Sequence, residues 1–422
     1  MEYKIYNAGS YNIHTIKTDK FKTIKLDIIL RNNFDPKNSE LRSLLFDILS
    51  ESTKKYDTKR KLALKYESLY NAVSNIDTML LGQMILTDIS IEFINPKYTK
   101  EDFLEEAIKM PFSLLFEPNI NNYEFDAKTI LLCKKRLIEK IDSIKENPSR
   151  YAILQALKKM DSTSLTSRPI LENKDTINNA TNESLLKLYE EVLKHDYVDI
   201  FIIGDFDNNK IVDLINKYAA FKTIKNHELK VYNENKTRRL PLKVKENSSN
   251  SQSQLVEVYN AVNLTDYEKK YVLPIYDMIF GSSSLESKLY KNLRTKNSLC
   301  YGLISSYQRY DNILVVATSL DKSNEEKAIK LIDKTFKEMT TSLKKEEIKR
   351  AIDLKISSLN MFIDYQGKIL ELYLFKYLNL ADDYETMINT FMNVKKEDIL
   401  AVGKKIKKNT VYILTAGGEE YE

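Results

Sequence analysis

The sequence predicts an α+β protein made of two homologous domains, each a mixed, mostly antiparallel sheet with helices packed on one face. Three observations support this fold class. Strands alternate with helices in both halves of the 422-residue chain, short turns join some strands in pairs, and the two halves repeat one order of elements. At about 150 residues per domain, the length suits two or three domains.

The two halves open in the same way. Alternating apolar and polar residues predict a strand at 21–32 and another at 252–262. Each strand leads into an amphipathic helix, at 39–53 in the first half and at 266–281 in the second. The common opening indicates a duplicated unit.

The halves also close alike, with a capped helix and a strand at 180–204 and again at 394–418. An offset of 214 pairs Leu186 with Leu400 and Gly204 with Gly418. Gene duplication is the economical explanation of this repeat.

Between these ends, the first half shows a strand pair around Gly82 and two helices within 127–160, separated near Asn147 and Pro148. The second half shows an apolar strand at 313–320, followed by helices from about 323 and 344. The second of these helices carries an apolar stripe that we expect to be buried, formed by Ile348, Ile352, Ile356, Leu359 and Ile363.

We predict domains at 1–222 and 251–422, joined by a linker at 223–250 where apolar periodicity stops. The linker contains the densest basic cluster of the chain: Lys236, Arg238, Arg239, Lys243 and Lys245. Flanking glutamates and the lack of interleaved aromatic residues favour a solvated connector, with one strand at about 240–244, over a nucleic-acid or membrane surface.

Composition excludes several classes of protein. The 65 basic and 60 acidic residues leave a net charge of +5, which implies neither nucleic-acid binding nor an acidic tail. No apolar run approaches the roughly 20 residues of a membrane span, and the first residues show no signal-peptide pattern. The two cysteines, Cys133 and Cys300, are expected to be reduced thiols in the core, which favours the cytoplasm.

The residue inventory also excludes common catalytic sites. His14, His195 and His227 are the three histidines, and none lies four or five residues from another, so two of them cannot ligate zinc from one helical turn. The sequence has no C-x-x-C, G-x-G-x-x-G, P-loop or G-x-S-x-G motif. For 281–288, GSSSLESK, we favour a loop and helix N-cap over a nucleophile.

One constellation suits chemistry. Leu285, Leu289 and Leu293 predict a short helix with one buried face and with Arg294 beside that face. In the strand that follows, Tyr301 is expected to point away from Cys300 and Gly302, with Gly302 leaving the backbone open.

Arg294 and Tyr301 would offer a positively charged donor and a neutral O–H donor to an oxyanion or a peptide carbonyl. The pair has no means of activating water. Spacing alone favours the alternative, in which Arg294 is a solvated residue at a helix end beside a half-buried Tyr301.

The run GSSSLESKLYKNLRTKNSLCYG resembles the C-terminal half of the M16 (pitrilysin/insulinase-like) zinc peptidases, and the resemblance extends across nearly the whole chain. Arg294 and Tyr301, seven residues apart, match the R/Y pair of that family. The resemblance implies two homologous α+β domains arranged as a clamshell.

The chain departs from the family at the metal site. Active M16 chains carry H-x-x-E-H on the helix after the first strand, where this sequence has Ser43, Phe46 and Asp47. The resemblance therefore implies no catalytic residue, metal ligand or cofactor in this chain, with zinc expected in a partner. We interpret Asp47 and Glu51 as ordinary solvated residues. His14 and His227 are expected to lie in exposed segments, and His195 at a helix end.

Within the family, the sequence resembles M16 subunits that lack zinc and pair with a zinc-bearing H-x-x-E-H subunit. More narrowly, it is similar to proteins linked to 5-aminopentanol modification of elongation factor P. The resemblance implies a heterodimer that acts on a peptide or an unfolded polypeptide, and it leaves open a homodimer of the isolated chain. Two alternatives stay open: a non-enzymatic peptide-binding or scaffold protein, and a self-sufficient hydrolase with an unfamiliar site.

Overall fold

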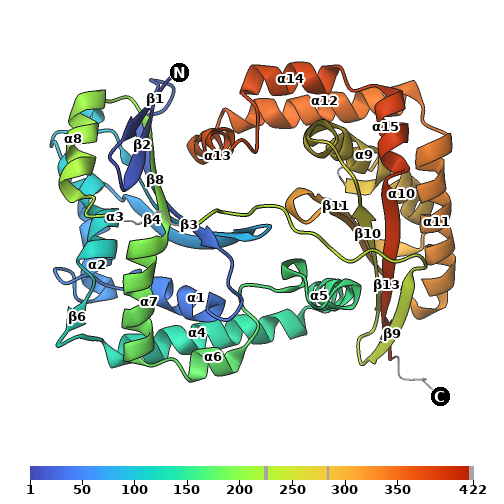
Figure 1. Cartoon of the computed structure of the whole chain (residues 1–422), viewed down its shortest axis with the longest axis horizontal. Helices are drawn as coiled ribbons and strands as arrows, with labels where there is room; N and C mark the ends of the chain where they lie inside the picture. The colour runs from blue at the N-terminus through green and yellow to red at the C-terminus, as the bar shows by residue number, and fades with distance from the viewer. Residues whose placement is uncertain (223–226, 283–284, 418–422) are drawn as a thin grey trace. The chain divides into compact units, whose positions relative to one another are not determined.

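The computed structural model describes residues 1–222, 227–282 and 285–417, and the chain divides into two compact units. Unit 1 combines Met1–Asp142 with Pro169–Val231, and unit 2 combines Ser143–Arg168 with the chain from Tyr232 onward. Figure 1 shows the elements of both units. Within the described residues, no helix has both the length and the apolar content that crossing a membrane requires.

Unit 1 is built on a six-stranded sheet in the order β1-β2-β8-β3-β5-β4. The β2–β8 pair is parallel and every other neighbouring pair is antiparallel. The strands are β1 (Glu2–Asn7), β2 (Tyr11–Lys17), β3 (Thr23–Asn33), β4 (Val73–Leu81), β5 (Met84–Ile94) and β8 (Tyr197–Gly204), with a separate small pair β6 (Ile120–Asn121) and β7 (Glu124–Phe125).

The helices of unit 1 supply the other half of its core, in which Leu26, Ile28 and Leu30 of β3 are fully buried. They are α1 (Ser39–Leu49), α2 (Lys59–Ser68), α3 (Leu104–Phe116), α4 (Ala127–Glu146), α6 (Lys174–Asn178), α7 (Asn182–His195) and α8 (Asn208–Tyr218).

Unit 2 is built on a five-stranded sheet in the order β11-β12-β10-β13-β9. Only β13 and β9 pair in parallel. The strands are β9 (Leu242–Ser248), β10 (Ser253–Ala261), β11 (Cys300–Gln308), β12 (Ile313–Leu320) and β13 (Ile406–Ala416).

The helices of unit 2 include the segment that precedes β11. They are α5 (Pro148–Met160), α9 (Leu273–Asp277), α10 (Lys288–Tyr290), α11 (Glu325–Thr341), α12 (Lys345–Phe362), α13 (Gln366–Tyr377), α14 (Tyr384–Met392) and α15 (Lys396–Gly403), with π-helical turns η3 (Glu268–Val272), η4 (Met278–Ser282) and η5 (Lys291–Thr295).

The strand orders confirm the predicted repeat of one plan. Without β1, the order β2-β8-β3-β5-β4 in unit 1 corresponds to β9-β13-β10-β12-β11 in unit 2. The single parallel pair occupies the same place in both sheets, and the closing strand, β8 or β13, lies in the interior of each. Gly418, the partner that the sequence repeat gives to Gly204, lies outside the described residues.

Several local predictions are confirmed. The hairpin of β4 and β5 turns at Gly82, whose φ of +60° is open to glycine. Asn147 caps α5 by accepting a hydrogen bond from the Arg150 backbone N–H, which separates α4 from α5 as expected. On α12, Ile348 and Leu359 are buried, and Ile352 and Ile356 pack against the same core.

The predicted helix at 266–281 is present, although only its middle is regular. Pro274 lies in this middle segment and has no backbone N–H to donate. The turns on either side, η3 and η4, are π-helical. The prediction missed β1 and β2, whose short strands precede 21–32.

Residues 143–168, which lie within the predicted first domain, pack with unit 2. Ala152, Ala156 and Met160 of α5 form a cluster with Val256 and Val258 of β10. Figure 1 shows α5 on one side of the β10–β13 pair and α11 on the other. The prediction of helices on one face is therefore wrong for this sheet, and every residue of β10 is buried because both its faces are covered.

The predicted linker, 223–250, is not a solvated connector in its second part, which belongs to the sheet of unit 2. Within it, β9 extends to Ser248 and pairs with β13 as a full edge strand. Arg238 donates hydrogen bonds to the carbonyls of Lys159 and Met160 at the end of α5. Lys245 forms an ion pair with Glu325 at 2.7 Å. Part of the basic cluster thus stabilises unit 2, while residues 223–226 lie outside the described residues.

Candidate functional site

The segment that carries Arg294 is a short helical stretch of unit 2 ending at the edge strand β11. Leu289 and Leu293 are fully buried, as their spacing predicts. Leu285, in contrast, is 66% exposed. The predicted three-leucine face is wrong at this residue because α10 begins only at Lys288, with Ser287 at its N-cap, so Leu285 precedes the helix.

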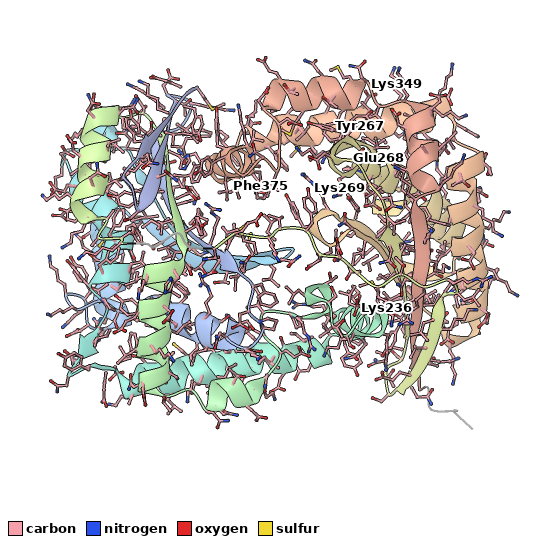
Figure 2. All side chains as sticks on the ribbon, in the orientation of Figure 1. Lys236, Tyr267, Glu268, Lys269, Lys349 and Phe375 are labelled. Atoms are coloured by element: carbon pink, nitrogen blue, oxygen red, sulfur yellow. The ribbon has the colours of Figure 1, made fainter. Side chains whose placement is uncertain are left out.

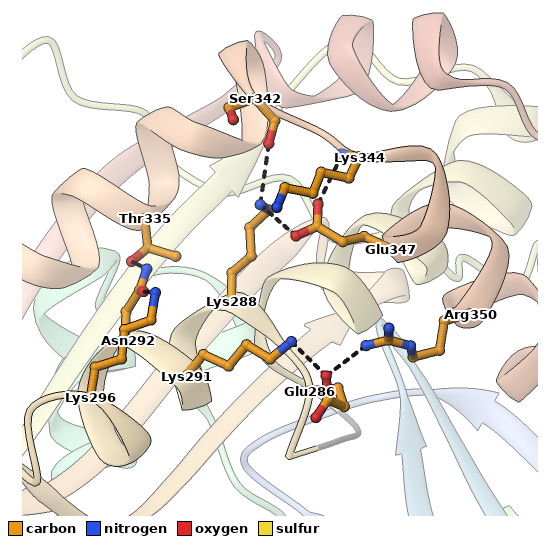
Figure 3. Close-up of polar contacts among 10 residues, drawn as sticks. All are labelled: Glu286, Lys288, Lys291, Asn292, Lys296, Thr335, Ser342, Lys344, Glu347 and Arg350. Atoms are coloured by element: carbon orange, nitrogen blue, oxygen red, sulfur yellow. Dashed lines mark hydrogen bonds and ion pairs between the residues drawn. The ribbon is translucent and has the colours of Figure 1, made fainter.

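Polar contacts hold this stretch against α11 and α12 (Figure 3). Lys288 forms an ion pair with Glu347 at 2.9 Å and also donates to the carbonyl of Ser342. Asn292 donates to the Thr335 hydroxyl at 2.9 Å. The backbone from Lys288 to Thr295 is therefore anchored on one side, and the opposite side presents Arg294.

The same figure shows Glu286 between two cations. Its carboxylate pairs with Lys291 at 2.5 Å and with Arg350 at 2.8 Å. These groups are exposed to solvent, so each pair adds little to stability. The two ion pairs orient the backbone just before α10.

Arg294 and Tyr301 do meet, but through the tyrosine backbone. Arg294 Nη1 donates a hydrogen bond of 2.9 Å to the Tyr301 carbonyl oxygen. The guanidinium also lies over the Tyr290 ring, 5.3 Å from its centroid. The phenol of Tyr301 is free of this contact, and its side chain is 62% exposed.

A β-bulge decides where Tyr301 points. Cys300 pairs with Leu320 and Gly302 with Ser319, so the register shifts by one residue and Tyr301 has no partner on β12. Tyr301 and Gly302 are both exposed, whereas Cys300 is buried. The predicted alternation, with Gly302 on the same face as Cys300, is therefore wrong, and two adjacent residues face solvent.

Gly302 leaves open space at this position. A Cβ added there would have no atom within 4 Å. Arg294, Tyr301 and Gly302 thus form an exposed donor surface, here called the R/Y surface, that nothing in the described part of unit 2 covers closely. Such a surface can bind a carbonyl or a carboxylate.

In unit 1, the residues at the H-x-x-E-H positions are unsuited to metal binding. Ser43 donates its hydroxyl to the Ser39 carbonyl, and Phe46 is buried in the core. Among the described residues, no group of three or more His, Cys, Asp or Glu side chains is arranged to hold a metal ion.

Glu51 corrects the expectation of a solvated residue, because it is only 5% exposed. Arg136 pairs with it at 2.7 Å and Lys59 at 2.9 Å, and Arg136 lies 3.8 Å from Asp47. Burial opposes ionisation of Glu51, but the hydrogen bonds from Lys59 and Arg136 outweigh it and lower its pKa. At Asp47, burial is the stronger effect and raises the pKa. Two cations therefore neutralise the acids at this end of α1.

His14 is fully buried, so the prediction of an exposed segment is wrong for it. It lies on β2, where Nε2 is 3.2 Å from Asp199 Oδ1 on β8 and Nδ1 is 2.8 Å from the Tyr3 hydroxyl. Arg31 of β3 pairs with the same carboxylate. The residues of this network all belong to unit 1.

The other two histidines have ordinary surroundings. His195 lies in the last turn of α7, as predicted, and its Nε2 is 3.4 Å from Glu191. His227 is half-buried, and its carbonyl accepts a hydrogen bond from the Tyr197 hydroxyl.

Asp277 was missed by the sequence analysis. It ends α9 and is almost fully buried, where it accepts hydrogen bonds from the Ser305 hydroxyl and the Tyr307 backbone N–H. Burial, opposed by these bonds, raises its pKa to about 6. The sequence did offer a sign of this site, because Asp277 is the single charged residue in the otherwise apolar run 271–280.

Comparisons with known proteins agree with this geometry. Residues 179–355 match the family model described as peptidase M16 inactive domain. The chain is 26% identical, over 415 residues and 96% of each chain, to a Bacillus subtilis (strain 168) protein named "Probable inactive metalloprotease YmfF".

Two solved structures show the same fold. A conserved protein from Enterococcus faecalis V583 matches with a TM-score of 0.92 at 24% identity, covering 99% of both chains. A protein from Pseudomonas fluorescens, described as a peptidase M16 inactive domain, matches with a TM-score of 0.79 at 16% identity, covering 99% of this chain and 98% of that one.

Proposed function

This chain is a member of the M16 peptidase family, similar to its inactive members, and from that premise we propose that it is the non-catalytic subunit of a heterodimeric zinc peptidase. In this proposal the zinc and the H-x-x-E-H motif belong to a partner chain. Arg294 and Tyr301 bind the scissile carbonyl of a peptide or an unfolded polypeptide and stabilise the oxyanion that develops on it.

The observation that carries the proposal is the exposure of the R/Y surface. Arg294 uses one N–H on the Tyr301 carbonyl, which leaves the remaining donors of the guanidinium available. The Tyr301 hydroxyl is an additional neutral donor on an exposed side chain. A donor pair with no water-activating group beside it suits a subunit that assists a catalytic centre supplied by another chain.

Unit 1 supports the same division of labour. Ser43, Phe46 and Asp47 stand where the resemblance requires two metal ligands and a base. The nearby acids are neutralised by Arg136 and Lys59. We infer a cytoplasmic location from the two free, buried cysteines, and a link to elongation factor P modification from the YmfF-like sequence.

The test is a peptide-cleavage assay of this chain and an H-x-x-E-H M16 chain, each alone and mixed, after co-purification. We expect cleavage only in the mixture. Removing one oxyanion donor by Arg294→Ala or Tyr301→Phe should lower turnover by about 10²–10³-fold without dissociating the complex. Arg239→Ala and Tyr365→Phe, which change exposed residues of the same unit, are the controls. Full activity of both Arg294→Ala and Tyr301→Phe would reject the role.

The alternative function is peptide capture without cleavage. The edge strand β11 favours it, because Ile304 is exposed there beside Tyr301 and an edge can pair with an added strand. If no H-x-x-E-H chain co-purifies with this chain, and the chain alone binds peptides without cutting them, the scaffold function replaces the first one.

A further inference from the structure

A second candidate site is a cavity of about 370 Å³ that lies wholly within unit 2. Its walls come from η3, α9, η4, the end of β11, and helices α12, α13 and α14. This volume is in the range of small-ligand sites, roughly 300–1,000 Å³. The R/Y surface residues do not line it.

The lining is mainly apolar and aromatic. Phe375 extends from α13, as Figure 2 shows, and four further side chains provide the apolar wall: Leu359, Phe362, Met387 and Phe391. A lining of this kind buries an apolar body and leaves a few polar groups to select its head group.

Three polar groups in the wall lack partners within the described residues. The buried Arg309 Nε and Tyr307 hydroxyl have no hydrogen-bond partner. Lys355 makes no ion pair there, and its ammonium only lies over the Phe391 ring, 5.4 Å from the centroid. All three groups are donors, so the ligand group that suits them is an acceptor.

Arg309 is held in place, and its charge acts on both Tyr307 and Lys355. Arg309 Nη2 donates to the Leu380 carbonyl and to the Tyr232 hydroxyl, which fixes the guanidinium. Burial lowers the pKa of Lys355, and the positive charge of Arg309 lowers it further. An anion between the two cations relieves both effects.

The acids of the cavity are already occupied by other partners. Glu371 pairs with Lys368 at 2.6 Å, and Asp382 accepts a hydrogen bond from Tyr271 and lies 3.8 Å from Lys270. Asp277 accepts its bonds from Ser305 and Tyr307, as described above. The charges of Arg309 and Lys355 are therefore left without a carboxylate of this chain.

We propose that this cavity binds a monocarboxylate with an apolar body, its carboxylate held by Lys355, Arg309 Nε and the Tyr307 hydroxyl and its body against the aromatic wall. Such a ligand is either the C-terminal residue of a short peptide ending in an apolar side chain or a free aromatic or aliphatic acid. The site requires neither a partner chain nor the R/Y surface, so it stands apart from the proposed function.

The experiment is calorimetric titration of the full chain, without a partner, with N-acetyl-Ala-Ala-Phe, its C-terminal amide and 3-phenylpropionate. We expect both acids to bind and the amide to bind at least about tenfold more weakly, because hydrogen bonds to charged groups contribute about 1.5–3 kcal/mol. Tighter binding of the peptide assigns the site to peptide C-termini, and tighter binding of 3-phenylpropionate assigns it to free acids.

Variants locate the binding. Lys355→Met should weaken the tighter acid about ten- to hundredfold, and Tyr307→Phe about two- to tenfold. Both variants remove a polar group that has no hydrogen-bond or ion-pair partner among the described residues, so both proteins should fold. Lys349→Met, an exposed lysine on the same helix (Figure 2), is the matched control and should leave affinity unchanged. Equal binding of peptide acid and amide, unchanged affinity in Lys355→Met, or no binding of either acid at millimolar concentration would overturn the proposal.

Discussion

Arg294 donates a hydrogen bond to the backbone carbonyl of Tyr301, 2.9 Å away, and leaves the phenol of that residue exposed. The contact aligns the guanidinium along the bulged start of β11. The two side chains are thus separate donors on one surface and do not satisfy each other. Under the proposed function, this relationship leaves both donors available to a substrate carbonyl.

Replacing Arg294 by lysine tests the importance of the guanidinium geometry. Lysine keeps the positive charge but loses the planar fork that bonds the carbonyl and lies over Tyr290. We expect the free energy of unfolding to change by less than about 0.5 kcal/mol, since the residue is exposed. Peptide cleavage by the mixed subunits should fall at least about tenfold. Wild-type turnover in this variant would show that charge alone suffices.

Gly302→Ala tests close approach to the R/Y surface. The added methyl group has open space and Gly302 is not among the positive-φ residues, so thermal unfolding should match the wild type. Cleavage by the mixed subunits should fall because the methyl group keeps the substrate backbone away. Ser306→Ala in the same strand is the control. A loss of stability without a loss of cleavage would contradict this interpretation.

Asp199→Asn tests the buried network of unit 1. Burial opposes ionisation of Asp199, but hydrogen bonds from His14 and Asn12 and the charge of Arg31 lower its pKa to about 2. Loss of the carboxylate leaves Arg31 buried without a counter-charge, so we expect a loss of about 3–5 kcal/mol in urea unfolding at pH 7.

The pH dependence of this effect has a definite sign. The pKa of Asp199 is lower in the folded protein than in the unfolded chain, where an aspartate has a pKa of about 3.9. Ionised Asp199 therefore stabilises the fold above that pH, and this stabilisation is lost as the pH falls through the pKa of the folded protein. The stability difference between wild type and Asp199→Asn should therefore shrink between about pH 4 and pH 2. A difference that is constant across this window would contradict the network described here.

Asp88→Asn should stabilise unit 1 at neutral pH. Burial, and next the charge of Asp27, raise the pKa of Asp88 well above its ordinary value, and one of its carboxylate oxygens has no hydrogen-bond partner among the described residues. Protonated Asp88 stabilises the fold at a pH below the pKa that an aspartate has in the unfolded chain. This stabilisation is lost as the pH rises through the higher pKa that Asp88 has in the folded protein.

The neutral amide removes this cost, so unfolding at pH 7 should require about 1 kcal/mol more. Differential scanning calorimetry at pH 7 and pH 4 measures the effect, which should be smaller at pH 4. Asp213→Asn, which changes an exposed aspartate on α8 of the same unit, is the control. A lower melting temperature for Asp88→Asn at pH 7 would contradict the assigned direction.

Local patterns predicted much of the fold because their causes lie within a few residues. The turn at Gly82, the cap at Asn147 and the buried faces of Leu289 and Leu293 depend on backbone geometry and on helical period. Leu285 shows the limit of this reasoning. The spacing of four residues predicted that Leu285 would extend the buried leucine face by one turn. The helix begins only at Lys288, so Leu285 does not belong to that face.

The sequence named Arg294 and Tyr301 as a candidate pair, and the resemblance matched them to a family motif, so their role stays a prediction. Their local geometry was predicted only in part. The bulge that turns Tyr301 and Gly302 to the same side arises from pairing with β12, which the strand's own alternation does not encode. The polar groups that line the cavity of unit 2 are drawn from η3 to α14, so no single window of sequence contains them.

By itself, the sequence determined the class of the fold and its internal repeat, because period and spacing are local properties of the chain. The tertiary structure alone decided that α5 packs on the sheet of unit 2 and that His14 is buried against Asp199, 185 residues away. Burial and charge pairing of this kind depend on which distant segments share a surface, and this is a property of the folded chain.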